Sequence, residues 1–168
     1  MRKSFLFLIF LIVGGVSGYL LFGILNKKSE LEDYSRKKQN ISWFNDYISQ
    51  KESIKLTEGM PVVFFFFNPD CDFCQHEAQA FKKQKGKISG IQWVWISGAE
   101  QEAIDKFAWK YSFHQVNDLY LIRDSSELIS DKVGISTLPQ ILVYSRSGKL
   151  VKEFKGETKI QAILDIIR

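Results

Sequence analysis

The stretch from residue 62 to residue 67 contains only valine and phenylalanine, in the order Val-Val-Phe-Phe-Phe-Phe. A strand with one face in water alternates apolar and polar side chains, whereas a strand that is covered on both faces is apolar throughout. Asn68 and Pro69 follow directly and end the strand, because proline lacks the N–H that a ladder needs. The chain is therefore expected to fold around a central parallel strand.

The only two cysteines of the chain, Cys71 and Cys74, come just after this strand. Their two-residue separation is typical of a redox dithiol on the first turn of a helix. At the helix start, free backbone N–H groups and the helix dipole would stabilise the thiolate of Cys71. Cys74, one turn later, would be close enough to attack a mixed disulfide. This spacing predicts Cys71 as the nucleophile and Cys74 as the resolving thiol.

The cysteine pair has two other interpretations, a zinc site and a structural disulfide. A zinc site needs two more ligands, and besides carboxylates the chain offers only His76 and His114, which do not form a His-x₃₋₅-His pair. A purely structural disulfide would close a very small loop and would add little stability. Redox chemistry without a bound metal or other cofactor is therefore the preferred interpretation.

The remaining hydrophobic pattern predicts alternating helices and strands, with a late hairpin. Helices are expected over 71–85, 99–113, 125–132 and 158–168, and strands over 91–96, 119–122, 140–144 and 150–154. The order is thus β-α-β-α-β-α-β-β-α. Alternating strands and helices imply parallel pairing, and the hairpin adds an antiparallel edge. We expect an α/β fold with a mixed central sheet and helices on both faces.

The first 25 residues predict a membrane anchor. Residues 5–25 contain no charged residue, and as a helix they would be about 31 Å long, which matches a hydrocarbon core of about 30 Å. A cleaved signal peptide is the alternative, but the run is long for one and residues 16–18 are a poor cleavage site. Residues 26–54 are expected to form a juxtamembrane linker and an amphipathic helix, in which Ile41, Trp43, Phe44, Tyr47 and Ile48 recur at helical spacing.

The predicted location follows from this anchor. A short tail before a single span usually leads to export of the domain that follows, although basic residues flank the run on both sides. We expect a single-pass protein of the inner (cytoplasmic) membrane whose domain faces the periplasm or the exterior. The net charge of +4 is spread along the chain and indicates solubility, not nucleic-acid binding.

A second motif lies far from the cysteines, where Ser136-Thr137-Leu138-Pro139 precedes an apolar strand. Together with the element order and with Cys71-Asp72-Phe73-Cys74, this motif resembles the thioredoxin fold over residues 55–168. Glu77 resembles a glutamate that often follows the cysteines in membrane-anchored TlpA/ResA-type thioredoxins. The resemblance implies that Thr137 and Pro139 position the substrate beside the cysteines. It also implies that the substrates are disulfides of exported proteins and that an unidentified electron donor is needed.

The site departs from the usual thioredoxin pattern in two places. Asp70 stands where the family usually has tryptophan, and Phe65 stands where typical thioredoxin has a buried acid that accepts a proton from the resolving thiol. Glu77 is a candidate replacement for that acid, although an exposed helix carboxylate is an equally good interpretation. Asp70 and Asp72 flank the nucleophile, and their negative charge opposes the helix dipole. We expect this acidic collar to make the dithiol reducing or selective for basic partners.

The sequence thus favours a membrane-tethered, extracytoplasmic thiol–disulfide oxidoreductase. One alternative is a thiol peroxidase, but phenylalanines 64, 65 and 67 supply neither the proline nor the hydroxyl of the Pro-x-x-x-Thr/Ser-x-x-Cys motif. Another is a non-catalytic binding module, or one that handles copper through the two thiols.

Overall fold

The computed structural model describes the backbone of residues 2–48, 54 and 56–167, and the side chains of these residues except 2–10, 46 and 48. The contacts divide the chain into two compact units, Met1–Arg36 and Lys37–Arg168. Each unit is described by itself.

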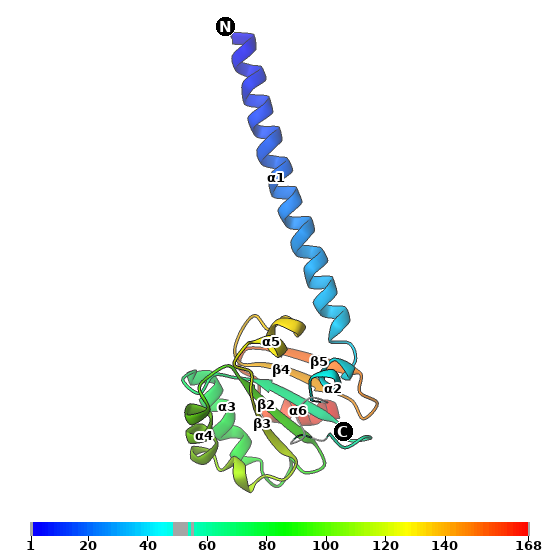
Figure 1. The fold of residues 1–168 in the computed structure, drawn as a ribbon, viewed down its shortest axis with the longest axis vertical. Coiled ribbons are helices and arrows are strands. Elements are labelled where there is room, and N and C mark those ends of the chain that lie inside the picture. Colours follow the sequence, from blue (N-terminus) through cyan, green and yellow to red (C-terminus); the bar gives the residue numbers. More distant parts are fainter. Residues whose placement is uncertain (1, 49–53, 55, 168) are drawn as a thin grey trace. The chain divides into compact units, whose positions relative to one another are not determined.

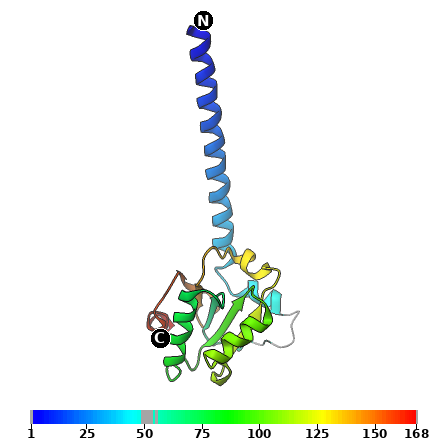
Figure 2. The same ribbon diagram turned by 90° about the vertical axis from the view of Figure 1, so that its left-hand side faces the viewer.

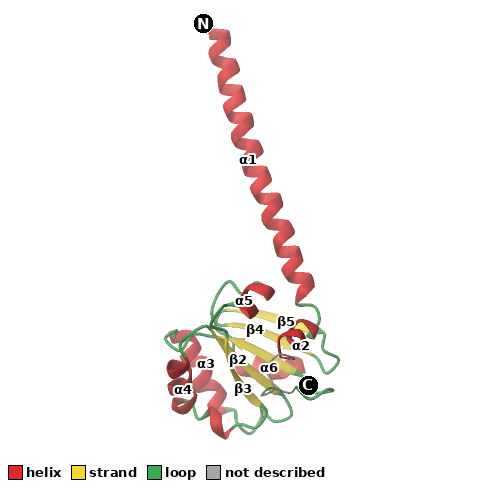
Figure 3. Ribbon diagram, in the orientation of Figure 1, coloured by secondary structure: helices red, strands yellow, loops and turns green. Residues whose placement is uncertain are grey.

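The first unit is a single continuous helix, α1 (Arg2–Lys37), as Figure 3 shows. Between residues 11 and 25, nine of its apolar side chains are 54–64 % exposed: Leu11, Ile12, Val13, Val16, Leu20, Leu21, Phe22, Ile24 and Leu25. Residues 5–10, with which the predicted anchor begins, lie outside the residues whose side chains are described. Among the described residues, no helix meets the length and apolarity that a membrane crossing requires.

The second unit is built on one five-stranded sheet with the strand order β3-β2-β1-β4-β5 (Figure 1). The strands are β1 (Val62–Phe66), β2 (Gln92–Ser97), β3 (Leu119–Arg123), β4 (Gln140–Tyr144) and β5 (Leu150–Lys155). Strand β1 pairs in parallel with β2 and antiparallel with β4, while β2 and β3 are parallel and β4 and β5 antiparallel. The expected mixed sheet is confirmed, and β1 lies at its centre.

Alternate residues of β1 point into two separate cores. Val63 and Phe65 contribute to one core, which includes side chains of three helices, α3 (Asp72–Lys83), α4 (Gln101–Lys110) and α6 (Ile160–Ile167), together with the short 3₁₀ helix η1 (Phe113–Gln115). Phe64 and Phe66 contribute to the other, with α2 (Ser42–Ile48) and α5 (Leu128–Val133). Figure 2 gives a second view of the helices around the sheet. Because helices cover both faces, every position of this strand is buried, which explains the unbroken apolar run.

The aromatic packing beneath the cysteines is dense. The ring of Phe65 stacks on that of Trp95, with centroids 3.8 Å apart and an angle of 15° between the planes. Trp95 also meets Phe81 and Phe113 at 5.5 and 4.7 Å. Phe65, where a buried acid was expected for the family, is 0 % exposed. The position therefore serves packing, since offset aromatic contacts of this kind stabilise a core beyond the area that they bury.

The segment that follows α1 is part of this second unit. Trp43 and Phe44 of α2 are buried against the sheet, while the side chain of Ile48 lies outside the described residues. Lys38, 7 % exposed, places its Nζ 2.8 Å from Oε1 of Glu153, and the same oxygen accepts a hydrogen bond from Gln140. Residue 38 is thereby joined to the strand that follows the Ser136–Pro139 loop.

Candidate active site

The two cysteines lie at the start of α3, directly beyond the carboxyl end of β1. Cys71 occupies the N-cap position and is partly exposed, whereas Cys74, inside the first turn, is 0 % exposed. Both are free thiols in the structure. The backbone N–H of Cys71 donates to the carbonyl of Asn68 at 3.1 Å, which holds the turn between strand and helix. The geometry agrees with an accessible first thiol and a buried second one.

The Ser136–Pro139 loop lies against the first cysteine, although 67 residues separate Leu138 from Cys71. The Sγ of Cys71 is 4.0 Å from the carbonyl oxygen of Leu138, and the Leu138–Pro139 peptide bond is cis. Pro139 is buried, and Thr137 is exposed beside it. The structure thus brings together the two motifs that the sequence suggested, and the direct neighbour of the sulfur is Leu138.

Burial separates the chemistry of the two thiols. The pKa of Cys74 is raised from 9.0 to about 12, mainly because the thiol is buried. A backbone hydrogen bond from Asn68 lowers this pKa, whereas the neighbouring Cys71 and Glu77 raise it. At neutral pH, Cys74 is therefore a thiol, and it must lose a proton before it can attack a disulfide. A proton acceptor near Cys74 would consequently assist the second half of a thiol exchange.

Glu77 is buried, which rules out the alternative that it is an exposed helix carboxylate. It lies one helical turn after Cys74 and is 2 % exposed, and its carboxylate accepts a hydrogen bond from the backbone N–H of Thr158. Burial raises its pKa from 4.5 to about 7, although the Thr158 hydrogen bond opposes the shift, and Glu157 adds to it. A carboxyl group with this pKa exchanges protons readily at neutral pH.

The raised pKa of Glu77 predicts a pH dependence of stability. Between pH 4.5 and about 7 the folded chain keeps a proton that the unfolded chain has released, so the free energy of unfolding falls as the pH rises through this range. Glu77→Gln still accepts the hydrogen bond from Thr158 but does not titrate. We expect this variant to gain stability relative to the wild type as the pH rises, as measured by urea denaturation at several pH values.

The matched control is Glu102→Gln, which removes an exposed carboxylate on α4 that is paired only with Lys106. Its stability difference from the wild type should change little between pH 5 and about 7.5. A difference between Glu77→Gln and the wild type that stays constant over the same range would contradict the raised pKa.

The two aspartates of the acidic collar, Asp70 and Asp72, are exposed on either side of Cys71. The N–H of Asp70 donates to Oδ1 of Asn68 at 2.9 Å. Asp72 is the first residue of α3, where its negative charge is attracted to the positive end of the helix dipole, although the same charge disfavours a thiolate at Cys71. Phe73, between the cysteines, is 55 % exposed. The surface around Cys71 therefore carries two acidic side chains, and Phe73 and Leu138 are exposed apolar residues beside them.

Gln75, which the sequence did not mark as a site residue, connects the turn to α4. Its Nε2 donates to the carbonyl of Pro69 at 2.9 Å, and its Oε1 accepts from Nζ of Lys110 at 3.1 Å. Nor did the sequence mark Thr158, the partner of Glu77. No local pattern marks either residue, because their partners come from distant parts of the chain.

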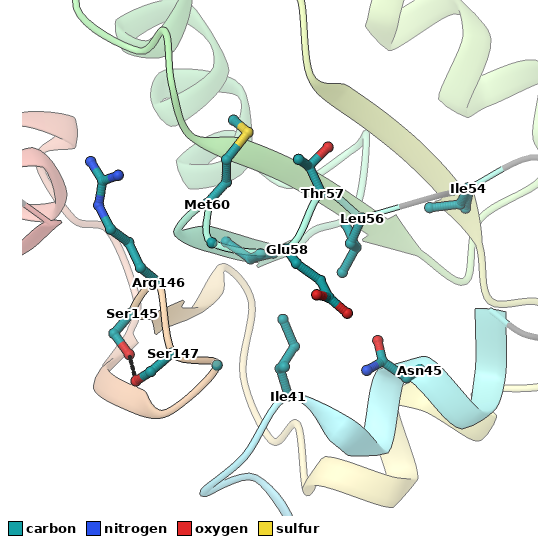
Figure 4. A pocket seen from close by; sticks show the side chains of 13 residues that line it. Ile41, Asn45, Ile54, Leu56, Thr57, Glu58, Met60, Ser145, Arg146 and Ser147 are labelled. Carbon is teal, nitrogen blue, oxygen red and sulfur yellow. Dashed lines mark hydrogen bonds between the residues drawn. The ribbon is translucent and has the colours of Figure 1, made fainter.

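A cavity of about 620 Å³ lies at the start of β1, at the end of the strand that is opposite the cysteines (Figure 4). Its lining includes Val62 at the start of that strand and Arg146 in the β4–β5 turn, and Glu58 and Ile41 are among the side chains drawn there. None of the predicted site residues lines it. Among the described residues, no cluster of three or more His, Cys, Asp or Glu side chains is arranged to hold a metal ion.

Comparison with known proteins supports the same fold. A search of curated proteins found no match. Among solved structures, a secreted disulfide oxidoreductase from Mycobacterium tuberculosis that is homologous to E. coli DsbE has a TM-score of 0.55 at 19% identity, with 65% of this chain and 81% of that chain covered. StoA from Bacillus subtilis has a TM-score of 0.53 at 16% identity, with 66% of this chain and 84% of that chain covered. Peroxidoxin BcpB from M. tuberculosis has a TM-score of 0.53 at 22% identity, with 64% of this chain and 80% of that chain covered.

These likenesses show the thioredoxin-like fold that the two motifs predicted. A model of the AhpC/TSA family matches residues 30–153, which is well over half of the chain and includes both cysteines and the Ser136–Pro139 loop. The chain therefore belongs to the AhpC/TSA family of thioredoxin-like oxidoreductases.

Proposed function

We propose that the protein is a membrane-tethered thiol–disulfide oxidoreductase that reduces or exchanges disulfides of exported proteins. The observation that carries the proposal is the contrast between a partly exposed Cys71 beside Leu138 and a fully buried Cys74 one turn later. A single exposed thiol followed by a buried partner is the arrangement that thiol exchange in two steps requires.

In the first step the thiolate of Cys71 attacks one sulfur of the partner disulfide. A mixed disulfide forms, and the other partner sulfur leaves as a thiolate that takes up a proton. In the second step Cys74 gives its proton to a base and attacks the sulfur of Cys71, which releases the second partner sulfur. Two electrons pass to the partner, the chain keeps a Cys71–Cys74 disulfide, and an external dithiol reductant must restore it.

Glu77 is the proposed base for the second step. It is the buried carboxylate closest in sequence to Cys74, and its pKa of about 7 lets it accept a proton at neutral pH and release it afterwards. The burial that raises the pKa of Cys74 makes such a base useful, because an unassisted thiol of this kind is rarely ionised. Thr137 and Pro139 are proposed to position the substrate chain, as the family resemblance implies.

The proposed location is the inner membrane, with residues 5–25 as a single-pass anchor and the thiol domain facing outward. The 21 uncharged residues and the exposed apolar side chains of α1 support the anchor. When intact cells are treated with a membrane-impermeant maleimide, we expect Cys71 to be alkylated. Labelling that occurs only after lysis would contradict the outward orientation.

The function is tested by reduction of insulin disulfides with dithiothreitol as the electron source. The full chain in detergent should accelerate the reaction, and Cys71→Ser should lose essentially all of this acceleration. Hydrogen peroxide consumption is the second arm, because two of the similar solved structures are a peroxidoxin and a peroxiredoxin. Peroxide consumption without insulin reduction would favour a thiol peroxidase, and tight Cu(I) binding without either activity would favour copper handling.

A further inference from the structure

A cavity of about 360 Å³ is lined in part by the Ser136–Leu138 loop, whose residue Leu138 contacts Cys71. Asn68 and Leu138 line this cavity, and both also contact Cys71, through the 3.1 Å backbone hydrogen bond and the 4.0 Å approach to Sγ. A polypeptide whose own cysteine reaches Cys71 therefore passes the mouth of the cavity. Its volume is within the range of sites that accept a ligand group.

The lining of the cavity includes a single charged residue, Glu127, at the start of α5. Its Oε1 lies over Gly98, 3.7 Å from the place that a Cβ would occupy there. The other lining residues are apolar or carry hydroxyl or amide groups, as Ser130 and Thr137 do. The electrostatic potential of the cavity is therefore expected to be negative.

The neighbouring carboxylates have partners, but the side-chain carboxylate of Glu127 has none among the described residues. Glu100 pairs with Arg123 at 2.6 Å, and Asp124 accepts hydrogen bonds from the backbone N–H groups of Ile129 and Ser130. Within the part of the chain that the structure describes, the carboxylate of Glu127 makes no hydrogen bond or ion pair. It is therefore free to bind a cation that a partner brings.

We propose that this cavity binds a lysine or arginine side chain located near the reacting cysteine of the substrate polypeptide. The apolar stem of such a side chain would lie along Leu138, which is 38 % exposed, while its cationic head reaches Glu127. The proposal rests on the proposed function, since it names the substrate class of the same site. It differs from the acidic collar, because Asp70 and Asp72 do not line this cavity.

The exchange test uses disulfide-linked peptide dimers that carry lysine, alanine or glutamate two residues from the cysteine. For the reduced wild-type chain in detergent, we expect the lysine peptide to react about fivefold faster than the alanine peptide, the size of one partly exposed ion pair. Glu127→Gln should remove most of this preference, and Glu127→Lys should reverse it toward the glutamate peptide. Glu58→Gln, an exposed carboxylate at the far end of the sheet, should keep the preference.

The double variant Asp70→Asn/Asp72→Asn separates the cavity from the collar. If the collar variant abolishes the lysine preference while Glu127→Gln keeps it, the cavity is not the binding site and the proposal is overturned. A wild-type chain that reacts equally fast with all three peptides overturns it as well.

A binding test without chemistry keeps the proposal independent of the redox reaction. The same lysine peptide with serine in place of cysteine is titrated into isotope-labelled chain and followed by NMR. The amide signals of Gly98 and Glu127 should shift in the wild type and much less in Glu127→Gln. If these signals shift but the chain exchanges no disulfide, the cavity site is supported and the proposed function is contradicted. If the chain exchanges disulfides but these signals do not shift, the proposed function is supported and the cavity site is contradicted.

Discussion

Cys74→Ser is expected to convert the protein from a catalyst into a trap that holds its substrate on Cys71. Cys71 remains partly exposed beside Leu138 and can still attack a disulfide, but the buried thiol that would release the partner is gone. An intramolecular thiol reacts far faster than one from solution, so release of the mixed disulfide should slow by on the order of 1000-fold or more. Non-reducing electrophoresis and mass spectrometry of the adduct measure this.

The matched control is Cys71→Ser, which keeps only the buried thiol. Cys74 is 0 % exposed, and its raised pKa leaves it protonated, so this variant should form no adduct. Adducts on Cys71→Ser but not on Cys74→Ser would reverse the assigned roles. Full turnover by Cys74→Ser would show that the partner's own second thiol resolves the intermediate.

Phe65→Asp is expected to unfold the second unit or leave it barely stable. The substitution restores the acid that typical thioredoxin carries at this position, but here the ring is fully buried and stacked on Trp95 at 3.8 Å. Removal of a buried aromatic side chain costs about 3–5 kcal/mol. Burial of a carboxyl group without a partner adds roughly 1–3 kcal/mol, and a whole domain has only about 5–15 kcal/mol of stability. Urea denaturation followed by near-ultraviolet circular dichroism measures the loss.

Two further variants separate packing from charge. Phe65→Leu keeps an apolar side chain at the position and should cost clearly less than Phe65→Asp. Phe73→Asp places the same carboxyl on an exposed position of α3 and should change the free energy of unfolding by about 0.5 kcal/mol or less. If Phe65→Asp is as stable as the wild type, the aromatic packing around Trp95 can accommodate a buried acid. The packing requirement would then not explain why phenylalanine stands at position 65.

The fold was largely predictable from local patterns. The unbroken apolar run at 62–67 identified the central strand, because only burial on both faces allows such a run. The spacing between apolar segments gave the order of helices and strands, and the structure confirms it. Boundaries were less accurate: the helix expected over 125–132 is observed as α5, Leu128–Val133, since helix ends depend on contacts beyond the helix itself.

The candidate site was predictable where residues act through sequence neighbours, and not where they act through distant ones. The spacing of Cys71 and Cys74 alone placed one thiol at the helix start and one a turn inside it. The state of Glu77 remained open, because its burial depends on packing around α3 and on Thr158, 81 residues away. Glu127 was not predicted as a site residue, since a single glutamate at the start of a helix matches no motif.

The sequence by itself determined the central strand, the dithiol that follows it and the thioredoxin-like order of elements, because short-range periodicity and spacing encode these features directly. Only the tertiary structure decided that Glu77 is buried one turn after Cys74 and that Glu127 lines the same cavity as Leu138, which contacts Cys71. Both depend on which loops meet at the carboxyl ends of the strands. Which loops come together there depends on the folded sheet, and no local segment of the sequence encodes it.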